Sequence, residues 1–583
     1  MKKKAIAPAC ARALALVLVA GGSMTAFLTM AGAASAQTGV DPVGRSGATA
    51  REELRLPPAE LEPPPRPVFE LPPLPPEPEE RLDTAQKLFV ADVSIEGNEA
   101  LDDATLAAIA RPFTGREVTL EELFRLKDLL TLAYVEAGYV NSGAVLPEQD
   151  VSDGIVRIEI VEGALETVEI DGTERLDSDF LERRVRLGAG PPLDVEDLQE
   201  RLQLLLLDPS IARLDARLGP GSRPGQARLE LDVEEGKRFA VELRASNDQS
   251  PSIGAYHGEV VASGRDFFGR GDEVIVQAGL TEGLKEAGAE VRVPLTPRGL
   301  TLHAGAQYSD SDLIDDEVKP LDIQSKSKSF TVGLAMPIIE TLDDKVVLDL
   351  FFTRERNETF LLGDPFSFSP GSDDGRTDLS LLRFSQTWQN RGRNRAFSLG
   401  STFTLGLDAF GATDNERDPD GEFFGWLLQA EAAQRLFTDT DQLVLRGEVQ
   451  LVDDPLLSSE QFAAGGIDSV RGYRTNELVR DMGWKASLEY RYPILDLLTA
   501  TRDYGSLELV PFVDAAGAFD HDGSPRDLKD DELLGAGLGL RYLLPPRLTA
   551  ELYWGYPILD RDGSSEDPLQ DAGVVFRVRF LAY

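Results

Sequence analysis

Two arginines stand in the segment SVRGYRTNEL, residues 469–478, of a chain whose formal net charge is −41. A guanidinium is planar and can hold a carboxylate through two parallel hydrogen bonds, so an arginine is suited to fixing a loop onto a buried acid. A solvated loop is the simpler interpretation, because most charged loop residues are only hydrated. The two interpretations differ in whether either arginine has an acidic partner elsewhere in the chain.

The segment PFVDAAG, residues 511–517, offers a partner for Arg471. Side chains alternate between the two faces of a strand. One face would carry Leu507, Leu509 and Val513, and the other would carry Ser506, Glu508, Phe512 and Asp514. A carboxylate on an enclosed face requires water or a cation, so Asp514 is a candidate partner for an arginine. No such partner is apparent for Arg474, for which the solvated interpretation stands.

Residues suited to catalysis are few. The chain has three histidines, His257, His303 and His521, and its sequence lacks the nucleophile elbow, the HExxH motif and the P-loop. A lipase with a serine and a histidine in contact is the remaining enzymatic alternative. We therefore expect a protein that is not an enzyme and that uses no cofactor.

The acidic segments at 309–322, 412–422 and 522–532 are either solvated loops or calcium loops, but none has the spacing D-x-[DN]-x-[DN]-G. The single cysteine, Cys10, lies near the N-terminus, so a thiolate site is not expected in the body of the chain. We expect no metal site. The negative charge also argues against a nucleic-acid partner, which requires a basic face.

Residues 1–36 have the features of a signal peptide. Three lysines precede an apolar stretch, and Ala34-Ser35-Ala36 is a small-residue cleavage site; an uncleaved anchor is the alternative. Residues 37–87 are rich in proline and predict a semi-rigid linker. A short helix at residues 48–55 would precede its proline-rich part.

Residues 88–236 contain an internal repeat, in which VSIEG at 93–97 corresponds to VEIDG at 168–172. The repeat predicts two copies of one small α+β domain, at 88–164 and 165–236. Each copy would contain a strand, two helices and two further strands. The expected N-terminal caps of the helices are Asp102, Thr119 with Glu122, Asp177 and Asp194. Such small sheets have open edges that an extended chain can join.

Residues 237–583 alternate between apolar and polar side chains in about ten-residue segments, as in the stripe Val274, Val276, Ala278 and Leu280. Tight turns alternate with long acidic loops between these segments. Beyond the first 36 residues no apolar run is long enough for a spanning helix, so membrane insertion would require a closed barrel. The pattern favours a β-dominated outer-membrane protein with a 16-stranded antiparallel transmembrane β-barrel after the two α+β domains.

Two motifs resemble those of a known family, the outer-membrane transporters of two-partner secretion. The series Tyr134-x3-Gly138-Tyr139, Leu146-Pro147-Glu148-Gln149 and Val161-Glu162-Gly163 resembles their first POTRA domain, although many members have proline where Glu148 stands. The run Val470-Arg471-Gly472-Tyr473 resembles the tip of their sixth extracellular loop. In this family the loop folds into the lumen, here about 453–482, and its arginine meets an aspartate of the wall. The resemblance implies that Arg471 meets Asp514. The family usually has Asp-x-Gly there, whereas this chain has Ala516.

The resemblance implies a function. The protein would sit in the bacterial outer membrane, in contact with its lipid, with its POTRA domains in the periplasm. Strand edges within 88–236 would recognise a large, unfolded exported partner, haemolysin-like or adhesin-like, which a monomer would translocate without ATP. Two alternatives remain: an insertase that assembles outer-membrane barrels, and a passive porin or surface adhesin.

Overall fold

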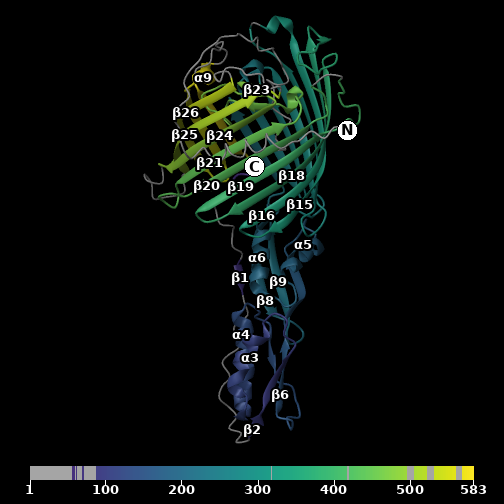
Figure 1. Cartoon of the computed structure of the whole chain (residues 1–583), viewed down its shortest axis with the longest axis vertical. Helices are drawn as coiled ribbons and strands as arrows, with labels where there is room; N and C mark the ends of the chain where they lie inside the picture. The colour runs from purple at the N-terminus through teal and green to yellow at the C-terminus, as the bar shows by residue number, and fades with distance from the viewer. Residues whose placement is uncertain are drawn as a thin grey trace.

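The computed structural model describes residues 56–59, 61, 68–70, 87–316, 318–415, 419–494, 505–521, 531–559 and 568–583. The expected signal peptide and the helix at 48–55 lie outside these residues. The molecule is elongated, with two small domains arranged end to end below a large barrel (Figure 1). Among the described residues, no helix is long and apolar enough to cross a membrane.

The first small domain has the predicted order of elements plus one additional pair of strands. Its elements are β2 (Lys87–Val90), β3 (Asp92–Glu96), α3 (Asp103–Ala110), η2 (Arg111–Phe113), β4 (Arg116–Thr119), α4 (Leu120–Glu136), β5 (Gly143–Val145) and β6 (Ile155–Val161). The sheet order is β3-β6-β5, and β2 pairs with β4. Asp102 caps α3, and Thr119 and Glu122 form the predicted capping box of α4. One apolar face of α4, with Leu123, Leu126 and Leu130, is buried against this sheet.

The second domain repeats this topology. It contains β7 (Ala164–Asp171), α5 (Ser178–Val185), η3 (Arg186–Gly188), α6 (Val195–Leu205), β8 (Ile211–Pro220) and β9 (Gln226–Glu235). Asp177 and Asp194 cap α5 and α6 as predicted. Leu198, Leu202 and Leu205 of α6 are buried in its core.

A glutamate at or directly after the end of each closing strand fixes the strand-to-helix loop of its own domain. Glu162 accepts hydrogen bonds from the N–H groups of Glu99 and Ala100 at 2.6 and 2.7 Å, and from the Tyr134 hydroxyl at 2.9 Å. Glu235 accepts from the N–H groups of Glu174, Arg175 and Leu176 at 2.8, 2.7 and 2.9 Å. The repeated Glu-Gly pair of the sequence therefore has the same structural role in both copies.

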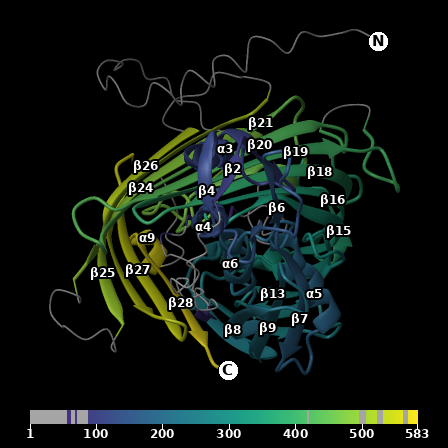
Figure 2. The same ribbon diagram turned by 90° about the horizontal axis from the view of Figure 1, so that it is seen from below.

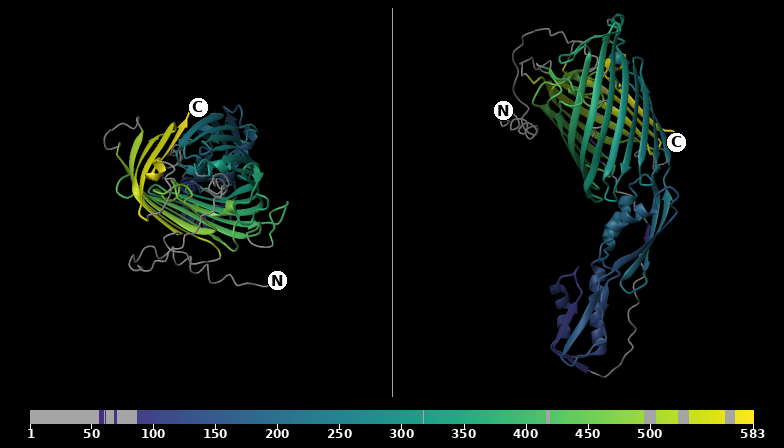
Figure 3. Two further views of the ribbon diagram at one scale, coloured as in Figure 1. Left: turned by 90° about the horizontal axis from the view of Figure 1, so that it is seen from above. Right: turned by 90° about the vertical axis from the view of Figure 1, so that its right-hand side faces the viewer.

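The rest of the chain forms the predicted closed barrel. Within the described residues, its sixteen antiparallel strands are β10 (Phe239–Ser246), β11 (His257–Arg265), β12 (Glu273–Leu280), β13 (Leu284–Pro294), β14 (Thr301–Asp312), β15 (Ile323–Glu340), β16 (Asp344–Leu361), β18 (Arg376–Arg391), β19 (Arg395–Gly406), β20 (Phe424–Gln434), β21 (Gln442–Val452), β24 (Met482–Pro493), β25 (Ser506–Phe519), β26 (Glu532–Leu544), β27 (Leu548–Pro557) and β28 (Val574–Leu581). The two-residue β17 (Asp364–Pro365) pairs with the end of β16. The barrel closes where β10 pairs with β28, from Glu242 opposite Leu581 to Ser246 opposite Arg577. Two further views show the wall surrounding a lumen and the small domains extending from one end (Figure 3).

The two faces of the wall differ in chemistry. Large apolar side chains point outward and are exposed, among them Val276, Leu280, Leu399, Phe403, Leu538, Leu540, Leu552 and Trp554. Polar and charged side chains alternate with them; His303, for example, lies 2.9 Å from the Asp349 carboxylate. The apolar outer face suits contact with lipid.

Parts of the proline-rich segment contact both the barrel and the second domain. Leu61 is buried among Ala396, Ala433 and Val444, and the Ala59 N–H donates to Glu431. These wall residues alternate with outward-facing neighbours, so this part of the segment lies against the inner wall. Further along, β1 (Val68–Glu70) adds a parallel strand to the edge of β8. The segment expected to be a linker therefore has specific docking points on the folded parts.

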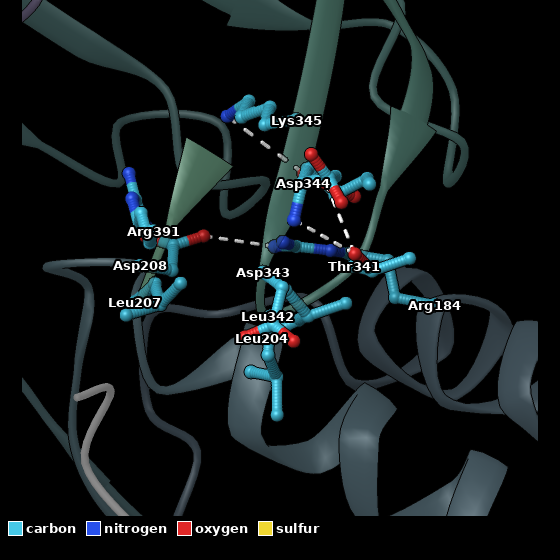
Figure 4. A pocket seen from close by; sticks show the side chains of 11 residues that line it. Arg184, Leu204, Leu207, Asp208, Thr341, Leu342, Asp343, Asp344, Lys345 and Arg391 are labelled. Atoms are coloured by element: carbon cyan, nitrogen blue, oxygen red, sulfur yellow. Dashed lines mark hydrogen bonds and ion pairs between the residues drawn. The ribbon is translucent and has the colours of Figure 1, made fainter. Parts of the chain in front are cut away.

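The second domain docks on the turns at one end of the barrel, and α6 overlies the barrel opening when viewed from below (Figure 2). Arg201 of α6 lies 3.2 Å from the Glu340 carboxylate, and Glu200 accepts from the Leu342 N–H at 2.9 Å. Beside this contact lies a polar pocket of about 270 Å³ (Figure 4). Its lining includes Arg184, Asp208, Asp343, Asp344, Lys345 and Arg391. The pocket belongs to the junction between the second domain and the barrel.

Candidate anchor of the inward loop

Residues 453–481 connect β21 to β24 and form what we call the inward loop. It contains η6 (Ser458–Glu460), β22 (Phe462–Ala464) and β23 (Leu478–Arg480), and the last two pair as an antiparallel hairpin. Its tip, 465–477, begins with Gly465 and Gly466, whose φ angles are 115° and 90°. Glycine adopts such angles without steric cost, so the glycine pair lets the chain turn back into the lumen.

Arg471, at the loop tip, binds Asp514 of β25 in a bidentate pair. Its Nε and Nη2 donate to the two carboxylate oxygens of Asp514, each at 2.7 Å. The backbone N–H of Arg471 donates to the same carboxylate at 3.1 Å. Arg471 is 2% exposed and Asp514 is fully buried. The structure therefore brings together Arg471 of the loop motif and Asp514, which strand alternation placed on the enclosed face.

A second carboxylate completes the site. Arg471 Nη1 donates to Glu489 Oε1 of β24 at 2.6 Å, and Nη2 donates to the Ser487 hydroxyl at 3.1 Å. Arg446 and Arg491 each lie 3.0 Å from the same Glu489 carboxylate, so the buried negative charge is balanced. Sequence reasoning missed Glu489. The charged alternation of the strand at 483–492 was the available signal, but it does not say which charged residue faces the loop.

Two aromatic rings, which meet edge to face, lie against the guanidinium. The Arg471 Cζ lies 3.7 Å from the ring centre of Phe512 and 4.7 Å from that of Tyr553. A cation above an aromatic face is stabilised when water is excluded. The predicted wall residue Phe512 thus contacts the arginine directly, whereas Tyr553 of β27 was not anticipated.

Glycines of β26 and β27 make room for the loop tip. A Cβ atom on Gly535 would overlap the carbonyl oxygen of Arg471, and one on Gly555 would lie 2.5 Å from the Gly472 nitrogen. Gly472 itself has a φ of 101°, and a Cβ there would lie 3.0 Å from Gly555. The loop backbone therefore sits directly on the wall at positions where any side chain would displace it.

Apolar contacts surround the charged pair. Val470 is fully buried, and Tyr473 lies with its hydroxyl 2.7 Å from the Leu559 carbonyl oxygen and 3.0 Å from that of Leu534. Both belong to one buried cluster with Ala516 of the wall. The methyl group of Ala516, which stands where the family usually has glycine, is thus accommodated within the loop contact.

The expectation for Arg474 is wrong. Its guanidinium lies 2.7 Å from the Asp571 carboxylate of α9 (Pro568–Asp571), so this arginine is paired rather than only solvated. Asp571 lies on a short helix just before the last strand. Nothing in strand alternation indicates such a contact, because it joins two connecting segments.

Among the described residues, no group of three or more His, Cys, Asp or Glu side chains could hold a metal ion. The Arg471 site consists of mutually neutralising charges held at hydrogen-bond distance. It is arranged to fix a loop in place, which is a positioning role.

Comparison with known proteins identifies the family. Residues 88–163 match the POTRA domain of ShlB type, and residues 225–542 match the haemolysin secretion/activation protein ShlB/FhaC/HecB. The outer membrane transporter CdiB of Dickeya dadantii is 24% identical over 77% of this chain and 79% of its own length. The heme/hemopexin transporter protein HuxB of Haemophilus influenzae is 20% identical over 68% of this chain and 70% of its own length.

Solved structures share the fold. CdiB from Escherichia coli superposes with a TM-score of 0.66 at 20% identity and covers 87% of this chain and 92% of its own. BamA from Haemophilus ducreyi, lacking POTRA domains 1–3, gives a TM-score of 0.52 at 14% identity, covering 85% of this chain and 100% of its own. With more than half of its length matched, the chain belongs to the ShlB/FhaC/HecB family of haemolysin secretion/activation proteins, the outer-membrane transporters of two-partner secretion.

Proposed function

We propose that this protein exports one large, unfolded partner protein, of haemolysin or adhesin type, as a monomer in outer-membrane lipid and without catalysing a reaction. Extended segments of the partner add to strand edges of the two POTRA domains, and the chain then passes the barrel. Folding of the partner outside the cell makes the passage directional, since the periplasm supplies no ATP.

The observation that carries this proposal is the buried anchor of the inward loop. Arg471, Asp514 and Glu489 hold the tip of the loop against the inner wall, with Phe512 covering the guanidinium. A passive porin needs neither an anchored loop in its lumen nor two additional domains with open strand edges. Edge strands of the POTRA sheets are β3 and β5 in the first domain and β7 in the second, while β1 occupies the edge of β8.

Deletion of residues 88–236 tests the proposal against the insertase alternative. We expect one large protein to disappear from the culture medium, while the general content of outer-membrane barrels stays normal. A general loss of outer-membrane proteins would favour the insertase. Unchanged secretion of every large protein would contradict both functions and favour a passive pore.

A further inference from the structure

The inward loop has a second buried charge contact with the wall, away from Arg471. Nη2 of Arg383 on β18 donates to Oε1 of Glu460 in η6 at 2.7 Å. Arg383 is fully buried and Glu460 is 4% exposed. In the barrel order, β19, β20 and β21 separate β18 from β24, where Glu489 binds Arg471.

The surroundings of this pair tie the loop arm that leaves β21 to the wall. Leu456 and Leu457 of the arm are buried with Leu379 and Leu381 of β18 and with Phe423. The side-chain amide of Gln450 donates to the carbonyl oxygens of Glu460 and Asp481, at 3.0 Å each. Both arms of the loop are thereby held to one residue of β21.

The energetic consequence follows from the burial. A buried ion pair contributes little net stability compared with apolar residues, but removing one partner leaves the other charge without compensation. Glu355 of β16, 2% exposed, interacts electrostatically with both Arg383 and Glu460. Loss of Arg383 would therefore leave the interacting carboxylates of Glu355 and Glu460 buried without this guanidinium, and the loop arm carries Glu460.

We propose that Arg383 and Glu460 form a second anchor that positions the inward loop for secretion, independently of Arg471. The Arg471 site fixes the tip, and the Arg383 site fixes the arm, so the loop is held on two separate parts of the wall. Arg383 and Glu460 are positioning residues. This inference rests on the proposed secretion function for its biological role, but the position of the loop can be measured without any partner.

A buried reporter between the two anchors tests the proposal. Ala464 is 1% exposed and lies between Glu460 and Arg471 in the loop. The single native cysteine, Cys10, lies in the expected signal peptide, so Ala464→Cys gives one thiol in the mature chain. The rate at which a maleimide labels this introduced thiol in the purified full-length protein reports exposure of the loop arm, and secretion of the partner is followed in parallel.

The variants, each made in the Ala464→Cys background, are Arg383→Met, Glu460→Gln and the charge exchange Arg383→Glu with Glu460→Arg. Arg376→Met is the matched control, because Arg376 lies on the same strand but pairs with Asp378, also on β18. We expect labelling to accelerate at least about tenfold in both single variants, with lower secretion, since a buried charge has lost its partner. We expect Arg376→Met to be labelled as slowly as the Ala464→Cys parent. The charge exchange should return the labelling rate towards that of the parent.

Slow labelling in both single variants would overturn the second anchor, whatever the level of secretion. Fast labelling with normal secretion would overturn its role in positioning the loop for transport. If the parent protein secretes no partner at all, the proposed function fails, while the labelling rates still decide whether the anchor exists.

Discussion

Gly535 and Gly555 matter because the loop tip occupies the space that their side chains would fill. Placing a methyl group at either position would push the backbone of Arg471 or Gly472 away from the wall. We expect Gly535→Ala and Gly555→Ala to lower secretion about tenfold, the scale of overpacking in a close contact, while the barrel still inserts. The measurement is secreted partner per unit of inserted barrel.

Gly447→Ala is the control for this prediction. A Cβ at Gly447 would find its nearest atom, the Lys485 carbonyl oxygen, at 3.9 Å, an ordinary contact. Normal secretion in Gly535→Ala and Gly555→Ala would mean that the loop tip does not need its close seat on the wall.

At the scale of single residues, the sequence predicts the Asp514 partner of Arg471 but not the other wall residues that contact the loop tip. Asp514 could be identified because strand alternation places it on the enclosed face, where its charge needs a partner. Glu489, Tyr553 and the two glycines could not, because alternation gives the face of a residue but not its distance from a loop tip. Arg474 was misjudged for the same reason, since its partner lies on a connecting segment.

At the scale of the elements, the closing glutamate of the second small domain, Glu235, predicts a dependence on pH. Burial raises the pKa of Glu235, but hydrogen bonds from the N–H groups of Leu176, Arg175 and Glu174 outweigh it and hold the pKa below its ordinary value of 4.5. Because the folded state binds this proton less tightly than the unfolded state, its stabilisation is present above that value and is lost as pH falls through the folded pKa.

The variant Glu235→Gln should therefore destabilise the second small domain by about 1–3 kcal/mol at neutral pH, with a smaller difference in acid. Protease sensitivity of the full chain, measured between pH 7 and about pH 3, reports this difference. Glu230→Gln is the control, because Glu230 lies on the same strand as Glu235 but forms a partly exposed pair with Arg217 of β8. A constant difference across the pH range would contradict the assigned role of the Glu235 carboxylate.

The pairing of β1 with β8 predicts competition with the exported partner. Glu70 and Arg217 are register partners in this pairing, so cysteines at both positions can lock β1 onto the sheet. If the partner displaces β1 and adds to the edge of β8, secretion should fall several-fold in the oxidised double variant and recover with a reductant. Each single-cysteine variant serves as a control. Normal secretion with the lock fully formed would exclude this edge as a site for the partner.

Most elements of the POTRA domains were predictable, because helix caps and a sequence repeat are local signals. The extra strands β2 and β4 and the docking of β1 were not. These strands are short. The three residues of β1, in the proline-rich segment, are too few to show the alternation of side chains that identifies a strand. Their formation depends on an edge that only the folded domain provides.

At the scale of the whole molecule, the architecture follows from two requirements. Backbone groups inside a membrane must be hydrogen-bonded, which a closed barrel achieves, and period-two alternation gives the wall an apolar outside and a polar inside. Alternation predicts the number of strands well, because each strand repeats the same signal. The path of the inward loop, and the contact of Leu61 with the inner wall, depend on parts that are distant in the sequence. The resemblance of the loop motif was needed to anticipate the path of the loop.

The most direct test of the central claim, that an anchored inward loop enables secretion, is the amount of partner exported by Arg471→Ala. Removing this guanidinium leaves Asp514 and Glu489 buried without it, which should weaken docking of the loop by about 3–5 kcal/mol. Arg292→Ala is the control, since Arg292 forms a half-exposed pair with Glu290 on the barrel wall. With equal amounts of inserted, heat-resistant barrel, the account predicts that Arg471→Ala exports less than about a tenth of the normal amount, on the scale of that lost docking energy, while the control exports normally. Normal export by Arg471→Ala would contradict it.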